Sequence, residues 1–353
     1  MFALGAASYA WSDNAAAAWF ASEKQLGLLL LPLVMTTLPR EREDYAFLAR
    51  SFIAGIALAL CICWMWALAV VVQSGTLPSY HAFGQPLGAH AGYLSLFALA
   101  AMVLAWPLKR ERAAISGWLR GAIIVLVLAS IWALASRLFL LVAMGYVLLW
   151  GWMAFGKKVH SEYWRKALLV CVLALLPVLA FLGPGKQRFL ELSEGGLEVL
   201  TMEEFSWDTP LNGFNLRVLY WRLAGEVLEE QSAWATGVGM GDAQDLLDAR
   251  YQALGIFTGD PKRGDTGYLG YNFHNQFLQS FVQLGALGVL LLLLALLALI
   301  WAATRIQFST GLVLVGCLCL FLLVESAFER QRGIFFFAML GGLFQAYREA
   351  ARV

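Results

Sequence analysis

The chain has 353 residues, of which 60% are hydrophobic and 14% are charged, and its mean hydropathy is +0.68. A soluble chain of this length needs far more charge, so the composition excludes an ordinary soluble protein and predicts a polytopic membrane protein. The formal net charge of +1 gives no reason to expect nucleic-acid binding. The positions of the charges are therefore more informative than their sum.

Apolar runs long enough for a bilayer of about 30 Å recur along the chain. Residues 1–11 are apolar but too short for a full span, and we interpret them as half a span or as the remnant of a longer N-terminus. Nine full spans are expected, at 25–38, 49–72, 89–106, 118–136, 137–155, 167–182, 277–301, 311–325 and 333–347. The predicted fold is thus an all-α helical membrane bundle, with an N-terminal bundle (1–184), a loop domain (185–273) and a C-terminal bundle (274–353).

Lysine and arginine fall in alternate short loops, which predicts the orientation of the spans. The loop at 73–88 has no charge, whereas the loops after the first, third and fifth spans are basic, with Arg40, Arg42, Arg50, Lys109, Arg110, Arg112, Arg120, Lys157, Lys158, Arg165 and Lys166. The basic loops are expected in the cytoplasm. The segment after Leu182 and the junction Ser136–Arg137 then face the outer side.

Three patterns stand out inside the outer segment. Apolar residues repeat at helical spacing over Asn215–Gln231, which predicts an amphipathic helix. The run 237–241, Gly-Val-Gly-Met-Gly, is interpreted as a tight turn rather than a phosphate loop, because no strand precedes it and no lysine follows it. Asp242, Asp245 and Asp248 then favour a solvated acidic helix face over a metal cluster, since no histidine or paired carboxylate completes a site.

Three arginines are candidates for binding an anion. Arg137 interrupts a long apolar stretch, where an arginine costs at least about 2.5 kcal/mol unless it snorkels or has a partner. Arg217 and Arg222 share the predicted helix, but five residues at 100° each place them about 140° apart. Arg222 has Glu226 four residues on as a ready surface ion pair, so Arg217 is the better candidate.

His274 is the candidate for proton transfer. Of the four histidines, it alone combines an outer location, a membrane-edge position and a polar neighbour, Asn275. A histidine at a helix start is more often a cap or a satisfied interfacial residue. Imidazole is nonetheless well suited to take a proton from a sugar hydroxyl, and arginines could bind a pyrophosphate leaving group by bidentate contacts.

Several of these features occur in an order typical of one group of enzymes. They are Ser136-Arg137 at the start of a span, Arg217 followed by Trp221 and the glycine run, His274-Asn275 followed by Leu278, Gly285 and Gly288, and the stretch 325–333, Glu-Ser-Ala-Phe-Glu-Arg-Gln-Arg-Gly. The set resembles the O-antigen ligase and Wzy-type polymerase superfamily. The resemblance covers most of the chain from about Trp11 onward, although the chain shows fewer spans than members commonly have.

The resemblance implies a GT-C-type integral membrane glycosyltransferase that uses no metal and no other cofactor. Such enzymes move a glycan from undecaprenyl pyrophosphate to an acceptor on the periplasmic face of the bacterial inner membrane, in ligases to a sugar of the lipid A core. If the roles of the family's residues apply to the matching positions here, Arg137 and Arg217 would hold the donor pyrophosphate. His274 would then activate the acceptor hydroxyl for inverting attack. Arg222 and Asn275 complete the expected substrate-binding set.

Other functions stay open. An O-antigen polymerase or a protein O-oligosaccharyltransferase would use the same chemistry. Enzymes that glycosylate asparagine are less favoured, because their Trp-Trp-Asp signature is reduced here to Ser206-Trp207-Asp208. A transporter of lipid-linked glycans is disfavoured, since the expected spans hold no acidic residue except Glu325 at an end and show no internal repeat. The expected partners are the lipid-linked donor, the lipid A–core acceptor and membrane lipids.

Overall fold

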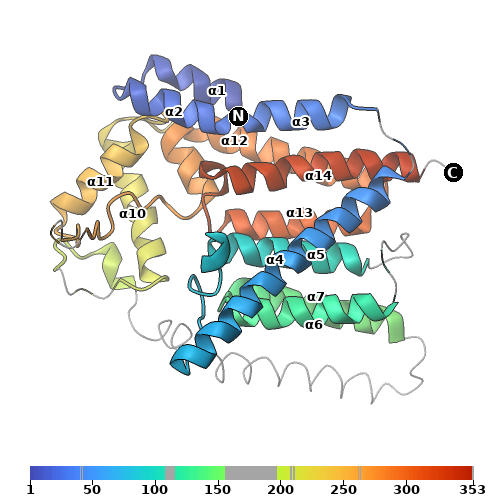
Figure 1. The fold of residues 1–353 in the computed structure, drawn as a ribbon. Coiled ribbons are helices and arrows are strands. Elements are labelled where there is room, and N and C mark those ends of the chain that lie inside the picture. The colour runs from blue at the N-terminus through green and yellow to red at the C-terminus, as the bar shows by residue number, and fades with distance from the viewer. Residues whose placement is uncertain are drawn as a thin grey trace. The chain divides into compact units, whose positions relative to one another are not determined.

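Every regular element in the described part of the chain is helical in the computed structural model (Figure 1). The structure describes residues 1–39, 41, 43–107, 115, 117–155, 197–206, 209, 211–260, 262 and 264–351. Over these residues the predicted all-α class is confirmed. The expected span at 167–182 lies outside the described residues.

The described residues fall into two compact units. Unit 1 draws on Met1–Leu38, Glu191–Trp301 and Cys319–Gly342, and unit 2 on Pro39–Leu190, Ala302–Leu318 and Leu343–Val353. Each unit therefore combines segments that are far apart in the sequence. The expected division at 184 and 274 remains a prediction.

Four helices form most of the described part of unit 2, and they lie at positions where spans are expected. They are α4 (Asp44–Ser74), α5 (Ala91–Ala105), α6 (Gly117–Ala133) and α7 (Arg137–Phe155). Helix α5 packs against α4, α6 and α7; in Figure 1 the ribbons of α5, α6 and α7 run in nearly the same direction, and α4 crosses them obliquely. Between α4 and α6 the indole of Trp64 donates a hydrogen bond of 2.9 Å to Ser130 Oγ.

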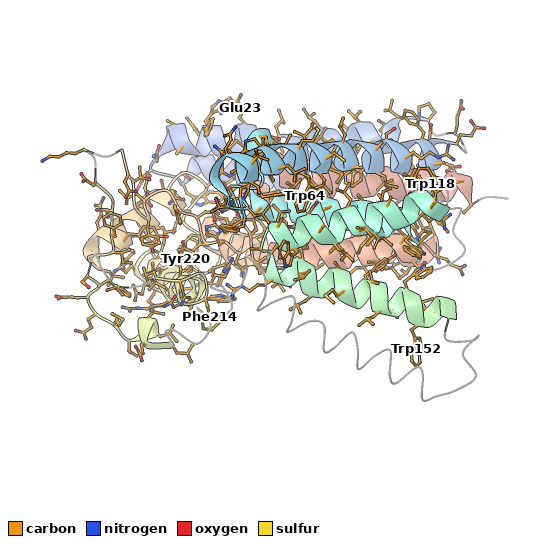
Figure 2. The ribbon with its side chains drawn as sticks, turned by 60° about the horizontal axis from the view of Figure 1, so that its bottom comes forward. Glu23, Trp64, Trp118, Trp152, Phe214 and Tyr220 are labelled. Carbon is orange, nitrogen blue, oxygen red and sulfur yellow. The ribbon has the colours of Figure 1, made fainter. Side chains whose placement is uncertain are left out.

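The pair of helices α6 and α7 has a hydrogen-bonded turn at one end and exposed tryptophans at the other. At the turn between the helices, Ala133 O accepts a hydrogen bond of 3.0 Å from Tyr80 N, which ties this turn to the uncharged loop before α5. At the other end, Trp118 and Trp152 are 79% and 51% exposed (Figure 2). Tryptophan is enriched where membrane meets water, so these two side chains suit an interface at that end.

Unit 1 contains the N-terminal helices and the outer segment. Its helices are α1 (Phe2–Ala7), α2 (Ala15–Gln25), α3 (Gly27–Thr37), α10 (Asn215–Glu230) and α11 (Ala243–Ala253), with the 3₁₀ turns η1 (Ser8–Ala10), η3 (Leu197–Leu200) and η5 (Ala327–Glu329). The predicted amphipathic helix is confirmed as α10. Its buried face, which includes Leu219, Tyr220 and Leu223, shares a core with Leu247 and Tyr251 of α11.

The remaining described α-helices are α12 (Gln276–Arg305), α13 (Ser309–Leu322) and α14 (Gln331–Ala350). Among the described helices, α4 and α12 are long and apolar enough to cross a membrane, whereas α5, α6, α7 and α13 are shorter apolar helices. Helix α5, for example, has 15 residues, or about 22 Å. The structure is thus compatible with a helical membrane protein, and the other expected spans remain predictions.

The exposed surface of α12 is apolar. Leu290, Leu294 and Leu297, at helical spacing, are 51%, 51% and 58% exposed. Leucines that repeat on one exposed face are unfavourable in water and suit a surrounding of lipid. This face therefore supports membrane association of α12.

Helix α12 is broken at Gly285, whose φ of 63° and ψ of −161° are not helical. A segment of unit 1, residues 234–239, crosses the break, and we call it the strap. Ala286 N donates to Trp234 O at 2.9 Å, and Val238 N donates to Val282 O at the same distance. The strap thus supplies main-chain partners that the broken helix lacks.

Glycines make this crossing possible. A Cβ on Gly285 would lie 2.3 Å from Ala235 C, and one on Gly237 would lie 2.3 Å from Leu284 N. A Cβ on Gly239 would lie 2.1 Å from Ser12 Oγ, so this glycine allows a close contact with the N-terminal segment. The glycine run therefore forms a turn, as predicted, and also a close backbone contact with α12 that the sequence did not indicate.

Candidate functional site

His274 lies two residues before the start of α12, in a backbone conformation that is uncommon for a residue other than glycine. Its φ is +45°, and its N–H donates to Asn272 Oδ1 at 2.9 Å. A non-glycine residue held in the left-handed region costs about 1–3 kcal/mol. Such strain persists only where the surroundings fix it, and it is frequent at functional sites.

Asn275 caps α12. Its Oδ1 accepts from Leu278 N at 3.0 Å, and its Nδ2 donates to Leu323 O at 3.1 Å. The side chain is buried, so both of its groups are engaged within the fold. The residue that caps α12 is therefore Asn275 and not His274, so the imidazole of His274 is not used as a helix cap. Binding of substrate by Asn275 stays a prediction.

The imidazole of His274 pairs with a carboxylate. Its Nδ1 lies 3.4 Å from Glu325 Oε2, and the side chains are 25% and 10% exposed. When Nδ1 carries the proton and donates it to Glu325, the lone pair of a neutral imidazole is on Nε2. From the sequence, Glu325 was part of the stretch 325–333 and the end of an apolar run, and its pairing with His274 was not predicted.

Aromatic rings hold this imidazole. Tyr220 of α10 stacks on His274 with a centroid distance of 6.0 Å and an interplanar angle of 26°, and Tyr271 meets it edge-on at 6.0 Å and 73°. Tyr220 (labelled in Figure 2) is fully buried, whereas Tyr271 is 44% exposed. One side of the site is thus part of the core, and the other reaches the surface.

Arg217 belongs to the same neighbourhood. Burial raises the pKa of Tyr220, and the positive charge of Arg217 acts against this rise, which places the guanidinium within electrostatic range of the Tyr220 hydroxyl. Arg217 is exposed, and its Nη1 donates to Gly213 O. An exposed cation therefore lies near the tyrosine that stacks on His274.

Arg222 has a different environment. Its Nε lies 2.6 Å from Glu226 Oε1, which confirms the ion pair predicted from the sequence. Its Nη1 also donates to the carbonyls of Val199 and Met202 at 3.1 and 2.5 Å. The guanidinium thus fixes η3 against α10, and a further role in substrate binding stays a prediction.

Arg137 is part of unit 2. It is the first residue of α7, where the sequence placed the start of a span, and Ser136 O accepts from Leu140 N at 2.9 Å. Ala135, in the turn before it, has a φ of +49°. The turn fixes Arg137 at the N-terminal end of α7, and binding of the pyrophosphate by Arg137 stays a prediction.

The three aspartates after the glycine run do more than form a solvated face. Asp242 accepts from Asp13 N and Asn14 N at 2.9 and 2.7 Å, which holds the start of α2. Asp245 accepts from Asn14 Nδ2 at 2.7 Å, and Asp248 accepts from Gly270 N at 3.1 Å. Each carboxylate therefore anchors another segment of unit 1.

Sequence reasoning also missed the role of three glutamines on α12, which we call the amide stripe: Gln276, Gln279 and Gln283. They are 1%, 4% and 4% exposed. Gln276 Oε1 accepts from Phe328 N at 2.7 Å, and Gln283 Nε2 donates to Glu329 Oε1 at 3.0 Å. Their spacing of three and four residues in an apolar helix was the available signal, because it puts polar groups on one face.

No protein-family model matches the chain, and no curated protein matches it. The chemistry of the site therefore rests on its geometry: a histidine oriented by a carboxylate, with an arginine nearby in the same unit.

Proposed function

We propose that the protein is a metal-independent, inverting glycosyltransferase of the bacterial inner membrane. It would move a glycan from undecaprenyl pyrophosphate to a sugar hydroxyl of the lipid A core, on the periplasmic face of a GT-C-type bundle of nine or ten spans. The observation that carries the proposal is the contact of 3.4 Å between His274 Nδ1 and Glu325 Oε2, since it orients an imidazole for use as a base.

The chemistry requires one proton transfer and one substitution. The acceptor hydroxyl gives its proton to His274 Nε2 while its oxygen attacks the anomeric carbon. The bond from that carbon to the pyrophosphate oxygen breaks, and undecaprenyl pyrophosphate leaves with the electron pair. The negative charge of Glu325 favours the imidazolium that forms, as in other histidine–carboxylate pairs.

The leaving group needs cations. A guanidinium stays charged beside lipid and contacts phosphate oxygens in a bidentate manner, so it can both anchor the donor and stabilise the charge that develops as the glycan leaves. Arg217 has the exposure and the neighbourhood for this role. Arg137 is proposed for the same role from its position at the start of α7.

Membrane insertion is supported by the apolar exposed face of α12 and by the tryptophans at one end of α6 and α7. The hydrogen bond between Tyr80 N and Ala133 O supports a common side for the uncharged loop and the Ser136–Arg137 junction. Both were expected on the outer side from the distribution of lysine and arginine.

The test is a gene deletion complemented by the wild-type chain or by His274→Gln. Core-only lipopolysaccharide, with long glycan chains retained on the carrier lipid, is expected in the deletion strain and in the variant. Core with a single repeat unit would instead indicate a polymerase. An unchanged lipopolysaccharide pattern would contradict transfer to the lipid A core and direct attention to protein glycosylation or transport.

A further inference from the structure

We propose that Gln279 is a positioning residue that sets the separation of His274 and Glu325 and thereby selects the tautomer of His274. The expected effect on glycan transfer rests on the proposed function. The effect on the tautomer does not, because it is a property of the protein alone.

One oxygen holds both sides of the pair. Gln279 Oε1 accepts a hydrogen bond from Phe273 N at 3.4 Å and another from Ser326 Oγ at 3.3 Å. Phe273 directly precedes His274, and Ser326 directly follows Glu325. The two segments that carry the imidazole and the carboxylate therefore meet at a single acceptor.

All three partners are shielded from water. Gln279 is 4% exposed, Phe273 is 1% exposed and Ser326 is fully buried. A buried donor that loses its acceptor cannot turn to solvent and must find another partner by moving. Loss of the Gln279 oxygen is thus expected to shift one or both segments rather than to be absorbed by hydration.

The main chain of Gln279 is fixed. Its main-chain N–H donates to Asn275 O at 2.8 Å, within the first turn of α12, and the Asn275 side chain caps that helix. The side chain that carries the acceptor is therefore attached to a rigid helix, while the groups that it binds lie in non-helical backbone. This arrangement lets the helix dictate the spacing of the pair.

The chemical consequence is a choice of tautomer. With Glu325 beside Nδ1, the proton of neutral His274 is held on Nδ1, and Nε2 is free to accept. If the carboxylate moves away, the two nitrogens compete for the proton. The fraction of molecules with a basic Nε2 then falls.

The experiment compares Gln279→Met with Gln283→Met in full-length protein in detergent. Both changes remove a buried amide from the same face of α12, but Gln283 binds Glu329 and not a neighbour of the pair. Nitrogen NMR of ¹⁵N-histidine-labelled protein at alkaline pH reports which ring nitrogen carries the proton, and His274→Gln identifies the signal among the four histidines. Gln279→Glu restores an acceptor oxygen, and Ser326→Ala removes only one donor.

In Gln279→Met we expect the Nδ1–H fraction of His274 to drop at least twofold and the turnover rate to fall at least 10-fold, with an unchanged KM for the donor. Gln279→Glu should recover the tautomer, Ser326→Ala should shift it in the same direction, and Gln283→Met should leave it at the wild-type value. A wild-type tautomer in Gln279→Met, or an equal shift in Gln283→Met, overturns the proposal. If the wild-type protein transfers no glycan, the proposed function fails, and the tautomer comparison still decides the role of Gln279.

Discussion

Glu325 Oε2 and His274 Nδ1 lie 3.4 Å apart, although the two residues are separated by 51 positions in the sequence. The first is held between α13 and α14, and the second precedes α12. A pair assembled from such distant segments depends on the contacts that hold each segment in place. Its chemistry is therefore sensitive both to the two side chains and to the contacts that hold them.

Removing either member of the pair should impair transfer to different degrees. A general base contributes about 10²–10⁴-fold, so His274→Gln is expected to lower the turnover rate by that range. Glu325→Gln keeps the shape and removes the charge, and we expect a loss of about 10²-fold. Initial rates with a purified lipid-linked glycan donor provide the measurement. Full activity of Glu325→Gln would show that the carboxylate does not assist the base.

Of the two arginines of α10, replacement of Arg217 should mainly lower glycan transfer, and replacement of Arg222 should mainly lower stability. Arg217→Met removes an exposed cation, so transfer should fall by about 10²-fold while stability changes by less than about 0.5 kcal/mol. Arg222→Met breaks the ion pair to Glu226 and two bonds to carbonyls, and should destabilise unit 1 by about 1.5–3 kcal/mol. Parallel thermal unfolding and transfer assays test this. The opposite pattern would exchange the roles assigned to the two residues.

Gly285→Ala should be among the most damaging single changes in α12. A Cβ there would lie 2.3 Å from the strap backbone, and φ is positive, so overpacking and strain together should cost about 2–6 kcal/mol. Gly341→Ala in α14 is the matched control, because a Cβ at Gly341 meets nothing within 4 Å. It should be neutral or stabilising by up to about 1 kcal/mol. The yield of folded protein and its melting temperature distinguish the two.

Buried tyrosines should limit stability at alkaline pH. Burial raises the pKa of Tyr220 and of Tyr251, so the unfolded chain, with tyrosine pKa values near 10, loses these protons before the folded one. The stability is present below about pH 10 and is lost as pH rises above it, by up to about 1.4 kcal/mol per pH unit for each group. Tyr220→Phe should reduce this slope between pH 10 and 11. Melting curves over that range, with the exposed Tyr9→Phe as control, measure it.

The orientation of the spans can be tested with single cysteines in a chain otherwise free of them. Thr76→Cys lies in the uncharged loop after α4, and Thr304→Cys lies near the C-terminal end of α12. In intact spheroplasts a membrane-impermeant maleimide should label Thr76→Cys and should label Thr304→Cys only after permeabilisation. Labelling of both without permeabilisation would contradict the predicted topology.

The sequence predicted helices better than it predicted contacts. The start of α7 at Arg137 and the extent of α10 follow directly from the apolar patterns, because burial and lipid exposure both select for them. The ion pair of Arg222 with Glu226 was also predictable, since residues four apart on a helix are neighbours. In each case the information is local.

The candidate site was only partly predictable because its partners are distant in the sequence. His274 stood out by its place between a polar segment and an apolar run, but Glu325 looked like the end of a span. The left-handed backbone conformation of His274 could not be predicted, because it occurs at a histidine and not at a glycine. The amide stripe was hidden in a helix whose average composition is apolar, and its role is clear only from the segment that it binds.

The strap has a consequence for how the chain is made. Residues 234–239 are synthesised before Gly285, so the main-chain groups that complete the broken helix already exist when α12 leaves the ribosome. The segment that completes α12 is therefore available from the moment that α12 is made, and α12 does not depend on a segment that is synthesised later.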